Sequence, residues 1–221
     1  MYIILIGAQG SGKGTQAELL AQTFDLQQVA SGDLLRKAFE EQTDIGLAAR
    51  RYVDRGELVP DELVVALVLQ RIGELDGTGG VLLDGFPRTV AQAEALARAL
   101  HDAGRRIDLA VYLDVPHAEL LKRLSGRYIC RASQHVYHAT FRPPKVAGVC
   151  DLDGSELYQR SDDTGEAIQK RLAFFFGETI QVVDYYARQR KLGLVDGNQS
   201  IERVHRELVA VINRFRATGT A

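Results

Sequence analysis

The hydrophobic positions of the chain form short continuous runs, separated by longer segments with helical periodicity. Four apolar runs, each followed within a few residues by Gly, Asp or Pro, indicate buried strands: Tyr2–Ile6, Val81–Leu83, Leu109–Leu113 and Leu192–Val195. A weaker fifth run lies at Leu26–Ala30. Strands of a parallel sheet are buried on both faces and therefore show continuous apolar runs rather than alternation. The pattern predicts an α/β fold with a parallel sheet flanked by helices.

Helices are indicated in the segments between these runs. Residues Gln92–Leu100 are rich in Ala and Leu and are followed by Gly104, a typical helix stop. Asp163 and Glu166 have the spacing of a capping box, which predicts the start of a long helix. Apolar side chains recur along that helix at intervals of three or four and predict a core-facing stripe: Ile168, Leu172, Phe175, Phe176, Ile180 and Val183.

Two segments do not fit the alternation of strands and helices. Residues 126–163 contain no long periodic helix, but they include Pro143, Pro144 and both cysteines. A structureless loop of this length is uncommon inside a compact domain, so we expect a small insert with its own turns and short strands. Residues 31–59 are polar and helical in pattern and predict a second insert.

Composition narrows the class of protein. The chain has 221 residues with 27 Lys+Arg, 29 Asp+Glu, 46% hydrophobic and 25% charged residues, values ordinary for a globular domain. They exclude a disordered chain, a collagen and a disulfide scaffold. The near-neutral charge argues against nucleic-acid binding, and no apolar run approaches the roughly 18 residues of a membrane span. The first residues lack the basic region of a signal peptide, and two cysteines suit a reducing compartment. We therefore expect a cytoplasmic protein.

The strongest chemical signal is the glycine-rich segment Gly7–Thr15 between the first strand and a helical pattern. In this context glycines let backbone N–H groups turn toward phosphate oxygens at the positive end of a helix, and Lys13 bridges the outer phosphates. This is the arrangement of a P-loop. Thr15 comes one place later than the usual hydroxyl residue, which alters the magnesium ligand. The alternative is a glycine-rich turn without a ligand.

Further signals follow the run Val81–Leu83. Asp84 ends that strand, where a carboxylate that organises Mg²⁺ belongs beside a P-loop, and Arg88 follows at a position suited to hold a phosphate. The alternative is that Asp84 caps a turn and Arg88 makes a surface ion pair. Arginines also recur along the chain, at Arg36, Arg88, Arg123, Arg127, Arg160 and Arg171. Fixed cations of this kind suit phosphoryl transfer, whose catalysis consists mostly of positioning and charge stabilisation, so no general base is needed.

With these motifs in order, the chain resembles the long-lid bacterial adenylate kinases over essentially all of its length. The resemblance is carried by Gly7–Thr15, Ser31–Arg36, Asp84–Arg88 with Gln92, Gly126-Arg127, Val136–His138 through Phe141–Pro144, Arg160–Asp163, Arg171 and Val195–Gly197. It implies a P-loop core with a five-stranded parallel sheet, formed by residues 1–29, 60–125 and 164–221. Two mobile inserts are implied, an AMP-binding insert at 30–59 and a lid at 126–163.

The resemblance also implies the reversible reaction ATP + AMP ⇌ 2 ADP, in a monomer that binds neither nucleic acid nor membrane. It assigns ATP to Gly10, Ser11, Gly12, Lys13, Gly14, Thr15, Arg123, Arg127, Val136, Tyr137 and Gln199. It assigns AMP to Ser31, Arg36, Glu57, Leu58, Val59, Gly85, Phe86, Pro87, Arg88, Gln92, Arg160 and Arg171. The catalytic set is Lys13, Arg88, Arg123, Arg160 and Arg171. Mg²⁺ is organised through water by Asp33 and Asp84.

Some positions depart from the family pattern. Ser31 stands where Thr is usual, although the hydroxyl group is kept, and Glu57 places a carboxylate near an anionic ligand. Many relatives carry a zinc site in the lid, and here the corresponding residues are Cys130, Ser133, Cys150 and Asp153. Because a Ser hydroxyl is a poor zinc ligand, a metal-free lid with reduced thiols and a Ser133–Asp153 hydrogen bond is favoured. Zinc, with His135 or His138 as a substitute ligand, and a Cys130–Cys150 disulfide are the alternatives.

Two other functions are compatible with a P-loop. A UMP/CMP-type kinase shares the Gly85–Arg88 turn, but such enzymes typically have a short lid, and the Gln92 amide suits an adenine edge. A non-enzymatic nucleotide switch is the second alternative. The sequence lacks the Asn-Lys-x-Asp motif of guanine-binding switches, and arginines in two inserts suit two nucleotides better than one. Both observations favour the adenylate kinase interpretation.

Overall fold

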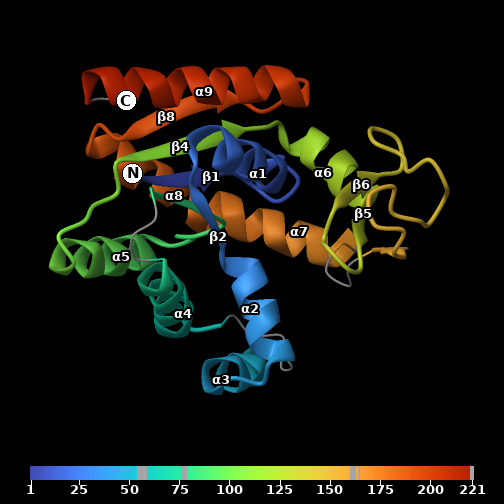
Figure 1. The fold of residues 1–221 in the computed structure, drawn as a ribbon, viewed down its shortest axis with the longest axis horizontal. Coiled ribbons are helices and arrows are strands. Elements are labelled where there is room, and N and C mark those ends of the chain that lie inside the picture. Colours follow the sequence, from blue (N-terminus) through green and yellow to red (C-terminus); the bar gives the residue numbers. More distant parts are fainter. Residues whose placement is uncertain (54–58, 76–78, 160–162, 164, 220–221) are drawn as a thin grey trace.

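A five-stranded parallel sheet lies between two layers of helices (Figure 1). The computed structural model describes residues 1–53, 59–75, 79–159, 163 and 165–219. The strand order is β2-β3-β1-β4-β8, and all four pairings are parallel. The strands are β1 (Tyr2–Ile6), β2 (Gln27–Ala30), β3 (Val81–Asp84), β4 (Leu109–Asp114) and β8 (Leu192–Asp196). The α/β prediction and all five expected strands are confirmed, including the weak one.

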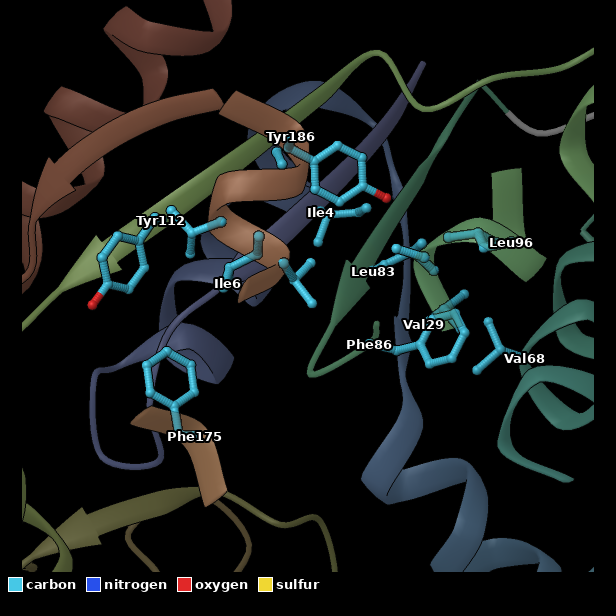
Figure 2. Close-up of a cluster of buried hydrophobic side chains, with 14 of the residues drawn as sticks. Ile4, Ile6, Val29, Val68, Leu83, Phe86, Leu96, Tyr112, Phe175 and Tyr186 are labelled. Atoms are coloured by element: carbon cyan, nitrogen blue, oxygen red, sulfur yellow. The ribbon is translucent and has the colours of Figure 1, made fainter. Parts of the chain in front are cut away.

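The continuous apolar runs are explained by two hydrophobic clusters, one on each face of the sheet. On one face, Ile3 and Leu5 pack with α1 (Lys13–Phe24) and α9 (Ile201–Thr218). On the other, Ile4 and Ile6 face a larger cluster formed with α4 (Asp61–Glu74), α5 (Val90–Asp102) and α8 (Ile180–Arg188). Figure 2 shows part of this second cluster around Phe86 and Tyr186. The two clusters cover both faces of the sheet, so the carboxyl ends of its strands are the part that remains for a functional site.

The expected long helix is confirmed in position but not in regularity. It consists of α7 (Gly165–Phe174), a π-helical turn η1 (Phe175–Thr179) and then α8. Ile168, Leu172 and Phe175 lie in the core as predicted, whereas Phe176 is 39% exposed and lies against His117, with ring centroids 5.6 Å apart. A π-helical turn holds more residues than an α-helical turn, so it shifts the spacing on which the predicted stripe depended.

Two parts of the chain project from the sheet layer in Figure 1. One contains α2 (Ser31–Glu40) and α3 (Asp44–Val53), which follow β2. The other follows α6 (His117–Ser125) and contains a small antiparallel sheet with the order β6-β5-β7. Its strands are β5 (Arg127–Cys130), β6 (Val136–His138) and β7 (Leu157–Tyr158). Short strands and turns are what the sequence predicts for 126–163, and the boundaries of both inserts stay predictions.

None of the helices in the described part of the chain combines the length and the apolar composition that a membrane crossing requires.

Candidate active site

The loop between β1 and α1 is shaped to receive an anion. Gly10 and Gly12 have φ angles of 84° and 93°, a left-handed conformation that glycine adopts without strain. At Gly10 a Cβ would also lie 2.9 Å from Cγ of Leu124. Gly12 caps the N-terminus of α1, where N–H groups and the helix dipole favour negative charge. Oγ of Ser11 is buried without a hydrogen-bond partner in the part of the chain that the structure describes, so its hydroxyl group is available to donate to a phosphate oxygen.

Lys13, the first residue of α1, lies among charged side chains. Its Nζ donates a hydrogen bond to the carbonyl oxygen of Ala8 at 3.0 Å. Removal from water lowers the pKa of Lys13 from 10.5 to about 8, and the nearby Asp84 carboxylate opposes this shift. Three guanidinium groups lower the pKa further, those of Arg88, Arg171 and Arg127. Three arginines from different segments therefore lie close enough to Lys13, beside the glycine-rich loop, to act on its charge.

A cluster of hydrogen-bonded polar groups, the Ser31–Arg88 cluster, lies where β2 and β3 end. Ser31 begins α2 and donates from Oγ to the Gly85 carbonyl oxygen at 2.8 Å. Nε of Arg88 donates to the same oxygen, also at 2.8 Å. The structure thus brings Ser31, Gly85 and Arg88 together, as predicted for the AMP site. Arg36, one helical turn beyond Ser31, forms an ion pair with Asp33.

The side-chain amide of Gln92 is held by hydrogen bonds within the protein, which the sequence does not indicate. Its side chain is buried, its Oε1 accepts from the backbone N of Arg88 at 2.7 Å, and its Nε2 donates to Asp61 at 2.6 Å. Thr89 donates to the other carboxylate oxygen of Asp61 at 2.7 Å. Asp61 was not predicted as a site residue. Its position after Pro60 in the first turn of α4 is a helix-start pattern, which carries no signal for a long-range contact.

Asp163 has a role in addition to the predicted helix cap. Its carboxylate, with a side-chain exposure of 0%, accepts from Nε and Nη2 of Arg127 at 2.8 and 2.5 Å. It also accepts from Nη1 of Arg171 at 3.1 Å. Charge-assisted hydrogen bonds from two cations are stronger than bonds from backbone N–H groups at a helix end; the residue after Asp163 lies outside the described residues, so the capping box stays a prediction. Asp163 holds two of the predicted phosphate-binding arginines at one place.

Arg123 connects α6 with the loop that follows β8. Its Nε donates to Glu119 at 3.0 Å, and its Nη1 donates to the Gly197 carbonyl oxygen at 3.1 Å. Gln199, in the same loop, donates from its side chain to Asp196 and Glu207. The structure therefore places the predicted residues Arg123 and Gln199 at one end of the sheet, on the side of the glycine-rich loop. Three other predicted residues, Glu57, Leu58 and Arg160, lie outside the described residues.

Comparison with known proteins identifies the family. The family model for adenylate kinase matches residues 5–191. The chain belongs to the adenylate kinase family. It is 48% identical over 204 residues to an adenylate kinase of Carboxydothermus hydrogenoformans, covering 92% of this chain and 95% of that one. It is 44% identical over 215 residues to an adenylate kinase of Staphylococcus aureus, covering 97% of this chain and all of the relative. A Staphylococcus epidermidis adenylate kinase is 43% identical over the same length.

Adenylate kinases use Mg²⁺ with ATP, and the chemistry of two carboxylates here fits that ion. Asp84 ends β3, and burial raises its pKa, while the charge of Lys13 opposes this rise. Asp33 lies close enough for its charge to raise the pKa of Asp84 further. A dication offsets both the burial of one carboxylate and the repulsion between the two, and Mg²⁺ prefers oxygen ligands.

The lid insert of this adenylate kinase contains a cluster of four metal-ligating side chains. The ligand atoms of Cys130, His135, Cys150 and Asp153 all lie within 4.8 Å of one another. His135 Nδ1 is 3.4 Å from Cys150 Sγ and 3.4 Å from an Asp153 oxygen, and Cys130 Sγ is 3.0 Å from that oxygen. Zinc bonds of 2.0–2.3 Å in a tetrahedron give ligand separations of roughly 3.3–3.8 Å. The donor types and their proximity suit a zinc ion, while the separations of 3.0 to 4.8 Å are less regular than in a tetrahedral site. Both cysteines are free thiols, which differs from the disulfide alternative.

His135 takes the place expected for Ser133 in this cluster. A reverse turn brings it opposite Cys130, since the Cys130 N–H donates to the His135 carbonyl oxygen at 2.9 Å. Ser133 contributes only its backbone N–H, 3.4 Å from Cys130 Sγ. The hydroxyl group beside the thiol is that of Ser155, at 2.9 Å, and the Ser155 N–H also donates to Asp153. The predicted Ser133–Asp153 bond is thus replaced by contacts of His135 and Ser155.

The predicted ATP-contacting pair of the lid lies next to this cluster. Val136 is 37% exposed, whereas Tyr137 is buried. The Tyr137 hydroxyl accepts from the backbone N of Asp151 at 2.8 Å and lies 3.4 Å from Cys150 Sγ. The strand that presents Val136 therefore packs through Tyr137 against the loop that carries Cys150 and Asp151.

Proposed function

We propose that this adenylate kinase carries out ATP + AMP ⇌ 2 ADP at the carboxyl ends of β1, β2 and β3. The observation that supports this site is the convergence of the Lys13 ammonium group with three guanidinium groups around the glycine-rich loop. Asp163 and Asp84 neutralise part of this positive charge, and a further anion among the four cations would stabilise their arrangement. A phosphoryl group in transfer spreads negative charge over its equatorial oxygens and supplies that anion.

Each nucleotide has its own side of the site in this proposal. The ATP phosphates lie on the N–H groups of residues 10–15 with Lys13 at the outer phosphates, and Arg127, Val136, Tyr137 and Gln199 hold ribose and base. AMP lies at the Ser31–Arg88 cluster, with its phosphate on Arg36 and Arg88 and its base near Gln92. Val59, Phe86 and Pro87 complete that side, together with Glu57 and Leu58.

Transfer begins when an AMP phosphate oxygen approaches the terminal phosphorus of ATP in line with the leaving oxygen. Lys13, Arg88, Arg123, Arg160 and Arg171 neutralise the charge that spreads over the transferring group. Asp163 releases or re-forms its contacts with the arginines as phosphate oxygens replace its carboxylate. When bound, Mg²⁺ supplies further charge neutralisation, with Asp33 and Asp84 holding its water ligands.

Closure of the two inserts keeps the reaction from water. The segment with α2 and α3 and the segment with β5, β6 and β7 project from the core in Figure 1, and an open site would transfer the phosphoryl group to water instead of AMP. We therefore expect both inserts to move when nucleotides bind. A bisubstrate analogue that joins two adenosines should compact the protein in small-angle scattering, and unchanged scattering at saturation would contradict this step.

The lid cluster is proposed to hold a structural zinc ion through Cys130, His135, Cys150 and Asp153. The sequence favours a metal-free lid because Ser133 would be a poor fourth zinc ligand. In the structure His135 occupies that place, and an imidazole is a far better zinc donor. We further propose a monomer that works in the cytoplasm, where free thiols such as those of the two cysteines persist.

Substitution of Arg88 tests the site. Arg88→Ala should lower kcat for ADP formation about a hundredfold, because one preorganised charge contact contributes on the order of 3 kcal/mol to transition-state stabilisation. Arg98→Ala is a matched control on α5, since the Arg98 side chain is 70% exposed. Circular dichroism should show the fold intact in both variants. Near-normal kcat in Arg88→Ala would contradict the assigned role.

A further inference from the structure

The junction between α6 and the lid sheet contains a histidine with both ring nitrogens in use. Nε2 of His138, the last residue of β6, lies 3.2 Å from the carbonyl oxygen of Lys122 in the last turn of α6. On the opposite side of the ring, Nδ1 lies 3.0 Å from the backbone N of Thr140 and 3.1 Å from that of Phe141. The ring thus connects a helix end with a lid turn that follows it by 16 or more positions in the sequence.

These three contacts specify one protonation state. A carbonyl oxygen only accepts, so Nε2 carries the hydrogen, and backbone N–H groups only donate, so Nδ1 presents its lone pair. The neutral Nε2–H tautomer satisfies all three contacts. Any other protonation state loses at least two of them, which leaves this tautomer as the one that fits.

The surrounding backbone is shaped to admit the ring. A Cβ at Gly126 would lie 2.5 Å from Cε1 and 2.6 Å from Nε2 of His138, so a side chain there would displace the imidazole. The Phe141 ring covers the other side, with a centroid separation of 4.4 Å. The Ala139 N–H donates to the Gly126 carbonyl oxygen at 2.8 Å, which closes the turn around the ring.

The ring connects the two arginines that lie on either side of Gly126. Arg123 follows Lys122 in α6 and reaches the Gly197 carbonyl oxygen. Arg127 begins β5, pairs with His138 in the sheet register, and reaches Asp163. The imidazole bridge joins the last turn of α6 to the lid sheet across Gly126, alongside the hydrogen bond from Gln159 Nε2 to the Ser125 carbonyl oxygen at 3.2 Å.

We propose that His138 is a positioning residue for phosphoryl transfer. Its imidazole joins the last turn of α6 to the lid sheet, so that Arg123 and Arg127 approach ATP as one rigid unit. The proposal rests on the roles proposed above for these two arginines, Arg123 at the transferring phosphoryl group and Arg127 at the ATP ribose and base. Catalysis by positioned charges is sensitive to misplacement of about 1 Å, which can cost up to about a hundredfold in rate.

Two amide substitutions separate the functions of the two ring nitrogens. In His138→Asn the amide oxygen takes the place of Nδ1, so the turn amides keep their acceptor while the bridge to Lys122 is lost. In His138→Gln the amide nitrogen takes the place of Nε2, so the bridge is kept while the turn loses its acceptor. His101→Asn is a matched control, because the His101 side chain is 91% exposed on α5.

Steady-state ADP formation should distinguish the variants. His138→Asn should lower kcat by about tenfold or more with KM for AMP within about twofold. His138→Gln should keep kcat within about twofold of the unmodified protein although its melting temperature falls, and His101→Asn should change neither quantity. Equal kcat in both His138 variants, or losses that follow the melting temperatures, would overturn the positioning role.

The tautomer supplies a readout that does not depend on activity. In a nitrogen-15 NMR spectrum near pH 8, the His138 ring should show a protonated Nε2 and an unprotonated Nδ1, and the opposite assignment would overturn the proposal. All kinetic comparisons are relative to the unmodified protein. Absence of ADP formation by that protein would contradict the proposed function, whereas unaltered kcat in His138→Asn would contradict only the role of His138.

Discussion

The lowered pKa of Lys13 predicts that ATP affinity falls as the pH rises above about 8. In the nucleotide-free protein, removal from water and three nearby guanidinium groups lower this pKa from 10.5 to about 8. Bound phosphates stabilise the ammonium form and raise the pKa again. ATP therefore binds preferentially to the protonated protein, and binding above pH 8 takes up a proton.

The size of the effect follows from the fraction of Lys13 that is protonated. With a pKa of about 8, roughly nine-tenths of the groups are charged at pH 7 and roughly one-tenth at pH 9. By linkage, the dissociation constant of ATP should rise about tenfold between these two values. Proton uptake should rise from about 0.1 to about 0.9 per ATP bound. The nucleotide itself contributes little, because phosphate second pKa values lie near 6.

Isothermal titration calorimetry measures both quantities. Titrations with MgATP at pH 7, 8 and 9, each in two buffers with different ionisation enthalpies, give the dissociation constant and the number of protons taken up. Lys13→Arg is the matched control, because a guanidinium group stays charged throughout this range and should abolish the pH dependence. Equal affinity at pH 7 and pH 9 with no proton uptake would refute the reasoning.

Three further predictions concern stability and metal content. Asp163→Asn should lower the free energy of unfolding by about 3 kcal/mol, because it leaves two arginines without their buried counter-charge; a melting temperature lowered by less than about 3 °C would contradict this. His135→Ala should remove stoichiometric zinc, measured by elemental analysis, and the destabilisation caused by chelator, whereas Ser133→Ala should keep both. Zinc-free unmodified protein would contradict the lid site. Tyr186→Phe should raise the free energy of unfolding by about 1 kcal/mol, because the buried Tyr186 hydroxyl has no partner among the described residues. Thermal or urea denaturation measures this change, and a lower free energy of unfolding in the variant would contradict the prediction.

The fold could be predicted because the relevant signals are local. Each strand of a sheet covered on both faces must be apolar throughout, as β1 and β4 are, and the glycines of the P-loop are required by backbone geometry within a few residues. Even the weak run at Leu26–Ala30 was in the correct place, since β2 (Gln27–Ala30) lies at the edge of the sheet and is buried less completely.

Other site residues could not be predicted because their roles arise from contacts between distant segments. Asp163 has the sequence spacing of a helix cap, and only the fold shows that it lies between Arg127 and Arg171. His135 lies two positions from the expected ligand Ser133, and a turn brings it to the cluster. Zinc-site spacing rules count residues along the chain and do not account for such a turn.

The error at Phe176 has a further cause, the local departure of the backbone from regular helical geometry. The apolar spacing predicts Phe176 in the core only for a helix of constant pitch. The π-helical turn changes that pitch and leaves the Phe176 side chain partly exposed. No simple sequence pattern marks a π-helical turn. Likewise, no simple sequence pattern marks the turn whose backbone N–H groups lie against the His138 ring.

The central claim, transfer between two adenine nucleotides, is tested most directly by the choice of phosphoryl acceptor. ADP formation from ATP should be measured in separate reactions with AMP, UMP, CMP and GMP as the acceptor, and in one reaction without any acceptor. Rapid ADP formation with AMP, and much slower formation in every other reaction, is the predicted result. Equal or faster formation with UMP or CMP, or formation that needs no acceptor, would contradict the account.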